Sequence, residues 1–184
     1  MALDSANVRV AITGAVMVAD TVEAAPVDGD TPWHGADLGY VSEDGVTETR
    51  ERSSESIRAW QNADTVREVV TEANLTYTFT LIETKAETVE LYYGSEVDAD
   101  GSLVVVPANT GGRKSFVLDV VDGDEFIRTY IPSGEVTEVG DQVYSNGEPI
   151  GYEVTIRAYP SSALSDAQGN AGSAKKWYSS LAGS

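Results

Sequence analysis

Apolar and polar residues alternate along several stretches of the chain, and this alternation is the pattern of half-buried β-strands. It is clearest over residues 75–81, where threonines separate the apolar positions, and it returns over 152–158. Residues 8–19 alternate in the same way with a break at Gly14, which predicts a strand with a bend or bulge. The composition agrees, because 23 valines and 16 threonines against 9 leucines suit a pleated sheet. We therefore expect a mainly β protein.

Other elements are shorter or less regular. Further strands are expected at 65–71, 103–106, 116–121 and 125–131, with another strand or two within 135–144. Asp122-Gly123 predicts a tight hairpin between two of them. One short helix is expected at about 84–93, because Thr84 and Glu87 have the spacing of a capping box and Gly94 is a typical helix stop.

Residues 22–64 follow neither the strand nor the helix pattern. This segment is polar, is interrupted by glycines and prolines, and holds Trp33, Tyr40 and Trp60. A loop of this length is uncommon in a compact domain and is usually functional or disordered, but disordered segments contain few aromatic residues. Two interpretations stay open: an irregular lid over the core with one or two short strands, or a contact arm that a partner orders.

The last segment, 160–184, differs in composition from the domain expected at 1–159. It is rich in serine, alanine and glycine and ends in an aromatic pair, Trp177 and Tyr178. Its two lysines and single aspartate give it a net charge of +1, whereas the rest of the chain carries −19. We expect an extended C-terminal arm that is attracted to acidic surfaces.

Charge and cysteine content exclude several classes of function. The 184 residues include 30 acidic and 12 basic residues, and the net charge of −18 argues against a nucleic-acid-binding module and against docking on anionic lipid. Without cysteine there is no disulfide, thiolate zinc site or thiol nucleophile. No apolar run is long enough to span a membrane, and the N-terminus lacks the basic start of a secretory signal. We expect a soluble, acidic protein, made and used without export and with no membrane anchor.

Candidate chemistry is sparse. His34 is the only imidazole, and no Gly-x-Ser-x-Gly elbow is present. Gly111-Gly112-Arg113-Lys114-Ser115 departs from the spacing of a phosphate loop, and a strand rather than a helix is expected after it. Residues 96–101 match the first half of a calcium loop, but Pro107 stands where the closing acid belongs. We therefore predict no catalytic, cofactor or metal site and no enzymatic activity.

Five short segments occur in an order that resembles the major tail proteins, or tail tube proteins, of long-tailed bacteriophages, particularly those that infect actinobacteria. These segments are 38–46 (LGYVSEDGV), 57–62 (IRAWQN), 66–67 (VR), 78–84 (TFTLIET) and 91–94 (LYYG). The resemblance covers residues 38–94 well and stays compatible to about residue 159. It implies an antiparallel β-sandwich or barrel-like tail tube fold with one short flanking α-helix.

The resemblance also implies a structural role. Family members form hexameric rings that stack into a hollow tube, and a long loop and terminal arms bridge neighbouring rings. The implied partners are further copies of the chain and the tape measure, tail terminator and tail tip proteins. The implied location is the virion tail, after synthesis in the bacterial cytoplasm. The candidate inter-subunit contact residues are Trp33, Tyr40, Glu43, Arg50, Arg52, Arg58, Trp60, Lys175, Lys176, Trp177 and Tyr178.

One alternative comes from another class of protein. A monomeric β-sandwich binding module, such as an adhesin or carbohydrate-binding domain, could use the aromatic residues for sugar stacking. Such modules usually have a signal peptide or disulfides, and neither is found here. In the tail tube interpretation, the acidic excess would let double-stranded DNA pass through the lumen without specific binding.

Overall fold

One large antiparallel sheet organises the chain in the computed structural model, which describes residues 8–20, 23–26 and 28–181. The strands are β1 (Thr13–Ala19), β2 (Ala36–Asp37), β3 (Val41–Arg58), β4 (Thr65–Leu81), β5 (Lys114–Asp122), β6 (Glu125–Val139), β7 (Tyr152–Ala158), β8 (Ser161–Ser165), β9 (Ala171–Gly172) and β10 (Lys175–Tyr178). The helices are α1 (Ala86–Tyr93) and a short 3-10 helix, η2 (Ser179–Leu181). The large sheet has the order β2-β1-β5-β6-β7-β4-β3 with β10 also on β6, and β8 pairs with β9 separately.

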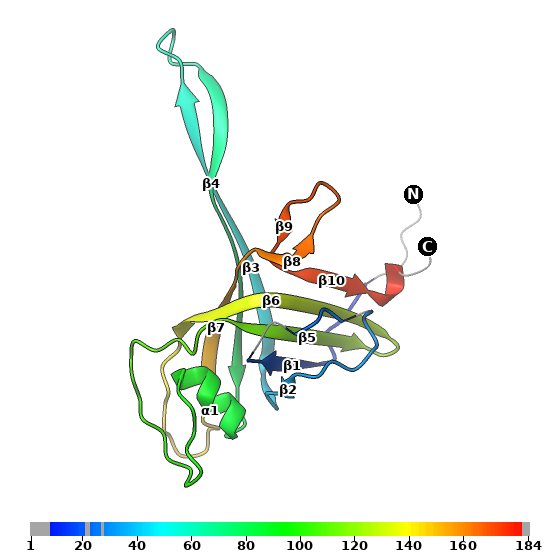
Figure 1. Cartoon of the computed structure of the whole chain (residues 1–184), viewed down its shortest axis with the longest axis vertical. Helices are drawn as coiled ribbons and strands as arrows, with labels where there is room; N and C mark the ends of the chain where they lie inside the picture. Colours follow the sequence, from blue (N-terminus) through cyan, green and yellow to red (C-terminus); the bar gives the residue numbers. More distant parts are fainter. Residues whose placement is uncertain (1–7, 21–22, 27, 182–184) are drawn as a thin grey trace.

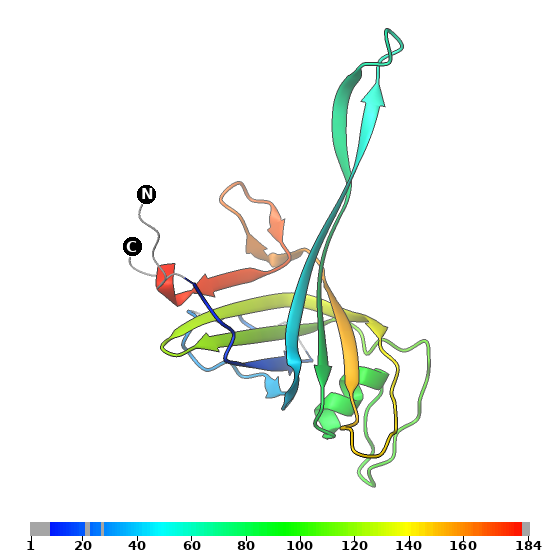
Figure 2. The same ribbon diagram turned by 180° about the vertical axis from the view of Figure 1, so that it is seen from behind.

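The sheet bends at β6, because two strands share one edge of it. β10 pairs with the first part of that edge and β7 with the second, while β5 pairs along the other edge. Register shifts at Lys114/Phe116 and Val136/Glu138 mark bulges of the kind that bend strands. In Figures 1 and 2, β1, β5 and β6 run across the molecule, whereas β3, β4 and β7 follow its long axis.

The core lies between these two parts of the sheet and α1. It includes Val16 and Phe116 from the crossing strands, Phe79 and Val154 from the long-axis strands, and Leu91 from the helix. Val16, Phe79 and Val154 are apolar positions of the alternating sequence pattern. The buried Thr88 hydroxyl of α1 donates a hydrogen bond to the Leu38 carbonyl oxygen at 2.9 Å, which fixes the helix on the start of the long hairpin.

The expected mainly β, antiparallel fold with one flanking α-helix is confirmed in the described residues. The Asp122-Gly123 hairpin forms between β5 and β6, and Gly94 ends α1 in the left-handed conformation with φ of 66°. The capping box is wrong: Lys85 occupies the N-cap, and its side chain makes no capping hydrogen bond but donates to the Asp37 carbonyl oxygen. The Thr84 hydroxyl instead lies 3.0 Å from the Tyr152 hydroxyl, which removes it from the helix terminus.

The expected loop over 22–64 is wrong in its second half, because β3 is a strand of 18 residues. It pairs with β4 along almost its whole length, and the strand expected at 65–71 is the first part of β4. Most of β3 is exposed on both faces, so it has no buried side to impose an alternation of apolar residues. The loop interpretation failed for that reason.

No strand forms at 103–106, and of the strand or two expected within 135–144 only the part up to Val139 forms, as the end of β6. β1 begins at Thr13 rather than at residue 8. The expected extended arm at 160–184 is also wrong within the described residues. Its residues form β8, β9, β10 and η2, and β10 pairs with β6 of the same chain. These strands of two to five residues are too short to show a periodic pattern.

Candidate assembly surfaces

The most exposed part of the described chain is the outer portion of the β3–β4 hairpin. β7 pairs with β4 only between Thr76 and Leu81, so residues 50–75, here called the distal hairpin, pair only with each other. Figure 1 shows this two-stranded ribbon leaving the body along the long axis of the molecule. A hydrogen bond of 2.8 Å from the Ala59 amide to the Asp64 carbonyl oxygen closes the tip.

Most apolar side chains on the distal hairpin are exposed, and Leu75 at its base is the one that packs against the core in the described chain. Ile57, Val66 and Val70 are each more than half exposed, and Trp60 at the tip is 97% exposed. An isolated two-stranded hairpin has marginal stability in water. Contiguous exposed apolar groups of this kind mark interaction surfaces. The distal hairpin therefore has the properties of a segment that another molecule covers.

The charge of the distal hairpin differs from that of the body. It contains four arginines and five acidic residues, for a net charge of −1, which leaves −17 on the rest of the chain. Arg50, Arg52 and Arg58, all expected contact residues, are exposed and form no ion pair among the described residues. Their guanidinium groups are available to acidic groups of another molecule.

The other expected contact residues near the start of β3 are also accessible. Tyr40 is 76% exposed, and Glu43 is exposed near the first residue of the strand. The structure therefore places Tyr40, Glu43, the three arginines and Trp60 along one continuous hairpin. Two of the arginines, Arg50 and Arg52, also line one groove with the C-terminal candidates Lys176 and Tyr178.

A groove of about 730 Å³ lies between the hairpin base and the C-terminal strand. Its lining includes Arg50, Leu75, Tyr77 and Lys176. Lys176 forms an ion pair with Glu48, and this contact ties β10 to the base of β3. Burial raises the pKa of Tyr77 far above its usual range, so this phenol stays neutral. The groove is thus closed on one side by an intrachain contact.

The C-terminal candidates lie on β10, where Lys176 and Trp177 are half-buried and Lys175 and Tyr178 are exposed. The Lys175 ammonium is 4.7 Å from the centroid of the half-buried Trp177 ring, and Tyr178 is 40% exposed. Beyond β10, the Ser179 hydroxyl accepts a hydrogen bond of 2.8 Å from the Phe126 amide. These contacts hold the segment against β6 of the same chain. They do not support the expectation of an arm that reaches a neighbouring molecule.

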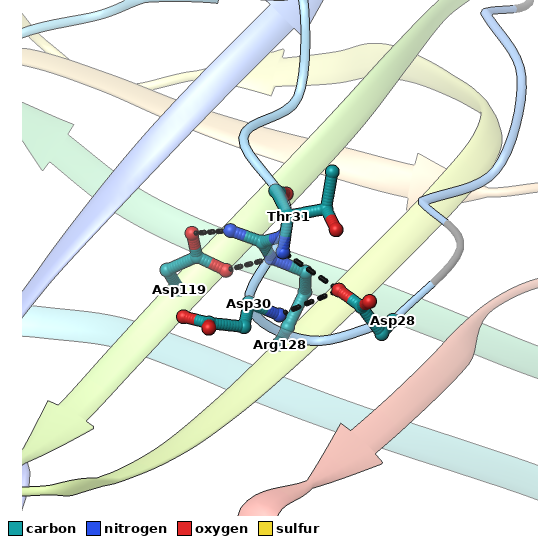
Figure 3. A network of polar contacts seen from close by, with 5 residues as sticks. All are labelled: Asp28, Asp30, Thr31, Asp119 and Arg128. Atoms are coloured by element: carbon teal, nitrogen blue, oxygen red, sulfur yellow. Dashed lines mark hydrogen bonds and ion pairs between the residues drawn. The ribbon is translucent and has the colours of Figure 1, made fainter.

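Trp33 lies beside a network of polar contacts that the sequence analysis did not predict. Its ring meets Tyr130 edge-on at 6.2 Å, and its indole nitrogen donates to the Ala24 carbonyl oxygen at 3.2 Å. Nearby, the buried Arg128 guanidinium donates two hydrogen bonds of 2.7 Å to Asp119 and one of 2.5 Å to the Thr31 carbonyl oxygen (Figure 3). Trp33 is therefore a packing residue of its own chain.

The same network fixes the turn before Trp33. The Asp28 carboxylate accepts hydrogen bonds from the amides of Thr31 at 2.6 Å and Asp30 at 3.0 Å, as Figure 3 shows. The amide and hydroxyl of Thr31 lower the pKa of Asp28, and the Asp119 carboxylate raises the pKa of Arg128. This turn is locked onto the β5–β6 hairpin by charge-assisted hydrogen bonds.

A second groove, of about 310 Å³, lies beside the C-terminal end of α1. It is lined by Leu91, Tyr92, Tyr93, Gly94, Val105, Val106, Pro107, Asn109, Thr110, Val136, Thr137, Glu138 and Val139. Val104, Val105, Val106, Val139, Val143 and Tyr144 are exposed in the same region. The apolar run at 103–106 that suggested a strand thus contributes side chains to this surface groove.

The described residues contain no group of three or more histidine, aspartate or glutamate side chains that could hold a metal ion. His34 is exposed and belongs to no such group. Among the helices of the described chain, none has the length and apolar character needed to cross a membrane.

Comparison with known proteins connects this architecture to tube-forming assemblies. The family model described as phage tail tube protein matches residues 1–168. The fold is similar to a chain in the cryo-EM structure of the anti-feeding prophage cap (AFP tube terminating cap), with a TM-score of 0.53 and 10% identity over 97% of this chain and 95% of that one. It is equally similar to a chain in the PVC sheath-tube complex of an extracellular contractile injection system, with a TM-score of 0.53 and 8% identity over 96% and 99%. No curated protein sequence matches the chain significantly.

Proposed function

Because the chain belongs to the phage tail tube protein family, we propose that it assembles into hexameric rings that stack into a hollow tube. The family match confirms the resemblance inferred from the sequence. Proteins of this family are structural, so the chain is a structural component of the phage tail and not an enzyme. The ring symmetry and the passage of DNA belong to the proposal.

The distal hairpin is the observation that carries this proposal. A ribbon with both faces exposed, with Trp60 at its tip and with unpaired arginines along it, is stabilised if it lies on neighbouring subunits. Specific interfaces bury about 800 Å² per partner, and a projecting ribbon supplies such area without changes in the core. The exposed sheet edge on β3 also suits pairing with another chain.

The acidic charge supports a conduit role. DNA is a dense polyanion, so a wall that carries carboxylates repels it and keeps it from adhering. With a body charge of −17 per copy, double-stranded DNA would pass through the lumen without specific binding. At its ends such a tube would contact the tape measure, tail terminator and tail tip proteins. The chain would be made in the bacterial cytoplasm before incorporation into the virion.

The alternative of a monomeric sugar-binding module loses its main support. Among the four aromatic residues considered for sugar stacking, Trp33 and Trp177 pack within the chain, and Tyr40 and Trp60 are largely exposed. These two stand at opposite ends of β3, about 60 Å apart along a strand that rises about 3.3 Å per residue. They cannot form one binding platform.

Negative-stain microscopy and sedimentation across a concentration series test the proposal. The wild-type chain should form rings at lower concentration and tubes at higher concentration. A variant in which residues 54–71 are replaced by Asn-Gly keeps the paired Ser53 and Glu72 and closes a short hairpin, and it should fold but form no tubes. Wild-type protein that stays monomeric at every concentration would refute the proposed function.

A further inference from the structure

Two clusters of exposed apolar side chains lie at opposite ends of the molecule. Ile57, Trp60 and Val66 surround the tip of the distal hairpin. The second cluster is the apolar rim of the groove beside α1, from Val105 and Val106 on one side to Val139 on the other. Figures 1 and 2 show the hairpin tip at one end of the longest axis and α1, with the loops around it, at the other. Intrachain contact between the two clusters is therefore excluded.

The groove beside α1 has a rigid wall. Tyr92 meets Tyr93 edge-on at 4.9 Å and Tyr152 edge-on at 5.5 Å. Its hydroxyl donates a hydrogen bond of 2.7 Å to the Gly140 carbonyl oxygen, and the Tyr93 hydroxyl donates one of 2.8 Å to Gln142. An aromatic side chain that entered the groove would find these rings already in place, so little ordering of the groove would oppose its binding.

The two ends also differ in charge. Residues 56–67 at the tip contain two arginines and one aspartate, for a net charge of +1. The segments around the groove are acidic: 84–113 carry five acidic and two basic residues, and 135–153 carry five acidic residues and no basic one, for a combined −8. Arg58 and Arg67 would therefore approach an acidic rim when Trp60 approached the groove.

We propose that the hairpin tip of one copy docks in the groove beside α1 of a second copy, with Trp60 as the anchor. The inference rests on the proposed tube assembly and names the surface that receives the hairpin. Because tip and groove are different surfaces at opposite ends, the contact is head-to-tail, and every copy can bind one neighbour through its tip and another through its groove. Such a contact propagates along an axis.

Cysteine cross-linking tests this directly, because the natural chain contains no cysteine to compete. A variant with both Gln61→Cys and Val106→Cys keeps the Trp60 anchor, because Gln61 is the exposed residue next to it at the tip, and it should form a ladder of disulfide-linked oligomers under mild oxidation. The matched control pairs Gln61→Cys with Val10→Cys. Val10 is also exposed and lines an apolar groove of about 210 Å³ near the chain ends. The control should give at least fivefold less cross-linked product.

Assembly measurements with single variants complete the test. Trp60→Ser and Val106→Glu should each raise the concentration needed for tubes at least tenfold and leave rings and thermal unfolding unchanged. The docking proposal alone would be overturned if the wild-type chain formed tubes while the Gln61→Cys, Val106→Cys variant gave no disulfide between positions 61 and 106. Stronger cross-linking in the control that carries Val10→Cys would overturn it equally. A wild-type chain that forms no assemblies would overturn the proposed function and this inference together.

Discussion

Replacing Arg128 by methionine should lower the free energy of unfolding by about 3 kcal/mol, at the lower end of the roughly 3–5 kcal/mol expected when one partner of a buried ion pair is removed. The guanidinium side chain is 7% exposed and forms two hydrogen bonds of 2.7 Å with Asp119. The lower end applies because the Asp119 side chain is 18% exposed, so water can solvate part of the orphaned carboxylate. Methionine keeps the aliphatic part of the side chain, which limits the loss of packing.

Urea unfolding followed by circular dichroism measures this change through the midpoint at constant m-value. A double-mutant cycle with Asp119→Leu isolates the pair. Each single variant leaves one charge buried without its partner, whereas the double variant leaves none, so the double variant should be more stable than the sum of the two losses implies. Arg58→Met is the matched control, since Arg58 is exposed without an ion pair among the described residues, and should change stability by less than about 0.5 kcal/mol.

The reasoning fails if Arg128→Met shifts the midpoint no more than Arg58→Met does. It also fails if the two single losses add in the double variant, because independent losses mean that the guanidinium and the carboxylate do not stabilise each other in the folded chain. A second consequence is local. Without Arg128 the Thr31 carbonyl oxygen loses its donor, so proteolysis should become faster near the turn that Figure 3 shows.

Three further predictions concern pH, packing and salt. The pKa of Asp28 is lowered in the folded chain, so the ionised carboxylate stabilises the fold at pH values above the ordinary pKa of 3.8, and this stabilisation is lost as pH falls through the folded value. Asp28→Asn should therefore flatten the acid side of a plot of urea midpoint against pH. Unchanged curvature would contradict this. Gly14→Ala should lower the free energy of unfolding by about 1–3 kcal/mol in thermal unfolding, since an added Cβ would lie 2.5 Å from the Asp119 carbonyl oxygen. An unchanged melting temperature would show that β1 and β5 can move apart at this position without cost. Light scattering should show tube assembly strengthening from about 10 to 150 mM salt, because screening weakens repulsion between chains of charge −18, and a steady decline would mean that ion pairs dominate the contacts.

Sequence periodicity located the elements that have a buried face. β7 and the inner part of β4 alternate because one side of each strand packs in the core, and both were expected. The Arg128–Asp119 pair was within reach of the same reasoning. The Asp122-Gly123 turn sets the register of β5 and β6, and counting outward from it places Asp119 opposite Arg128. This register count is the sequence signal that predicts the Arg128–Asp119 pair.

The distal hairpin could not be found in this way. β3 has serine, glutamate, threonine and arginine on both faces, and its conformation depends on the hydrogen bonds of β4, not on burial. The apolar run at 103–106 misled in the opposite sense. Its valines suggested a strand, but they have no partner strand and stay exposed. Most side chains of both segments are exposed in the folded chain, and a pattern rule that assumes an internal core misreads them.

These two segments explain why so acidic a chain is suited to ordered assembly. A free sheet edge on β3 and apolar groups at both ends favour association, and without restraint such features lead to irregular aggregation. The body charge of −17 opposes contact between most surfaces of two copies, because few positively charged patches are present to pair with the negative ones. The near-neutral hairpin, with its four arginines, is the region that this repulsion affects least. In the proposed assembly, charge would therefore favour contacts made through the hairpin, and the direction of the hairpin would set the axis along which copies add.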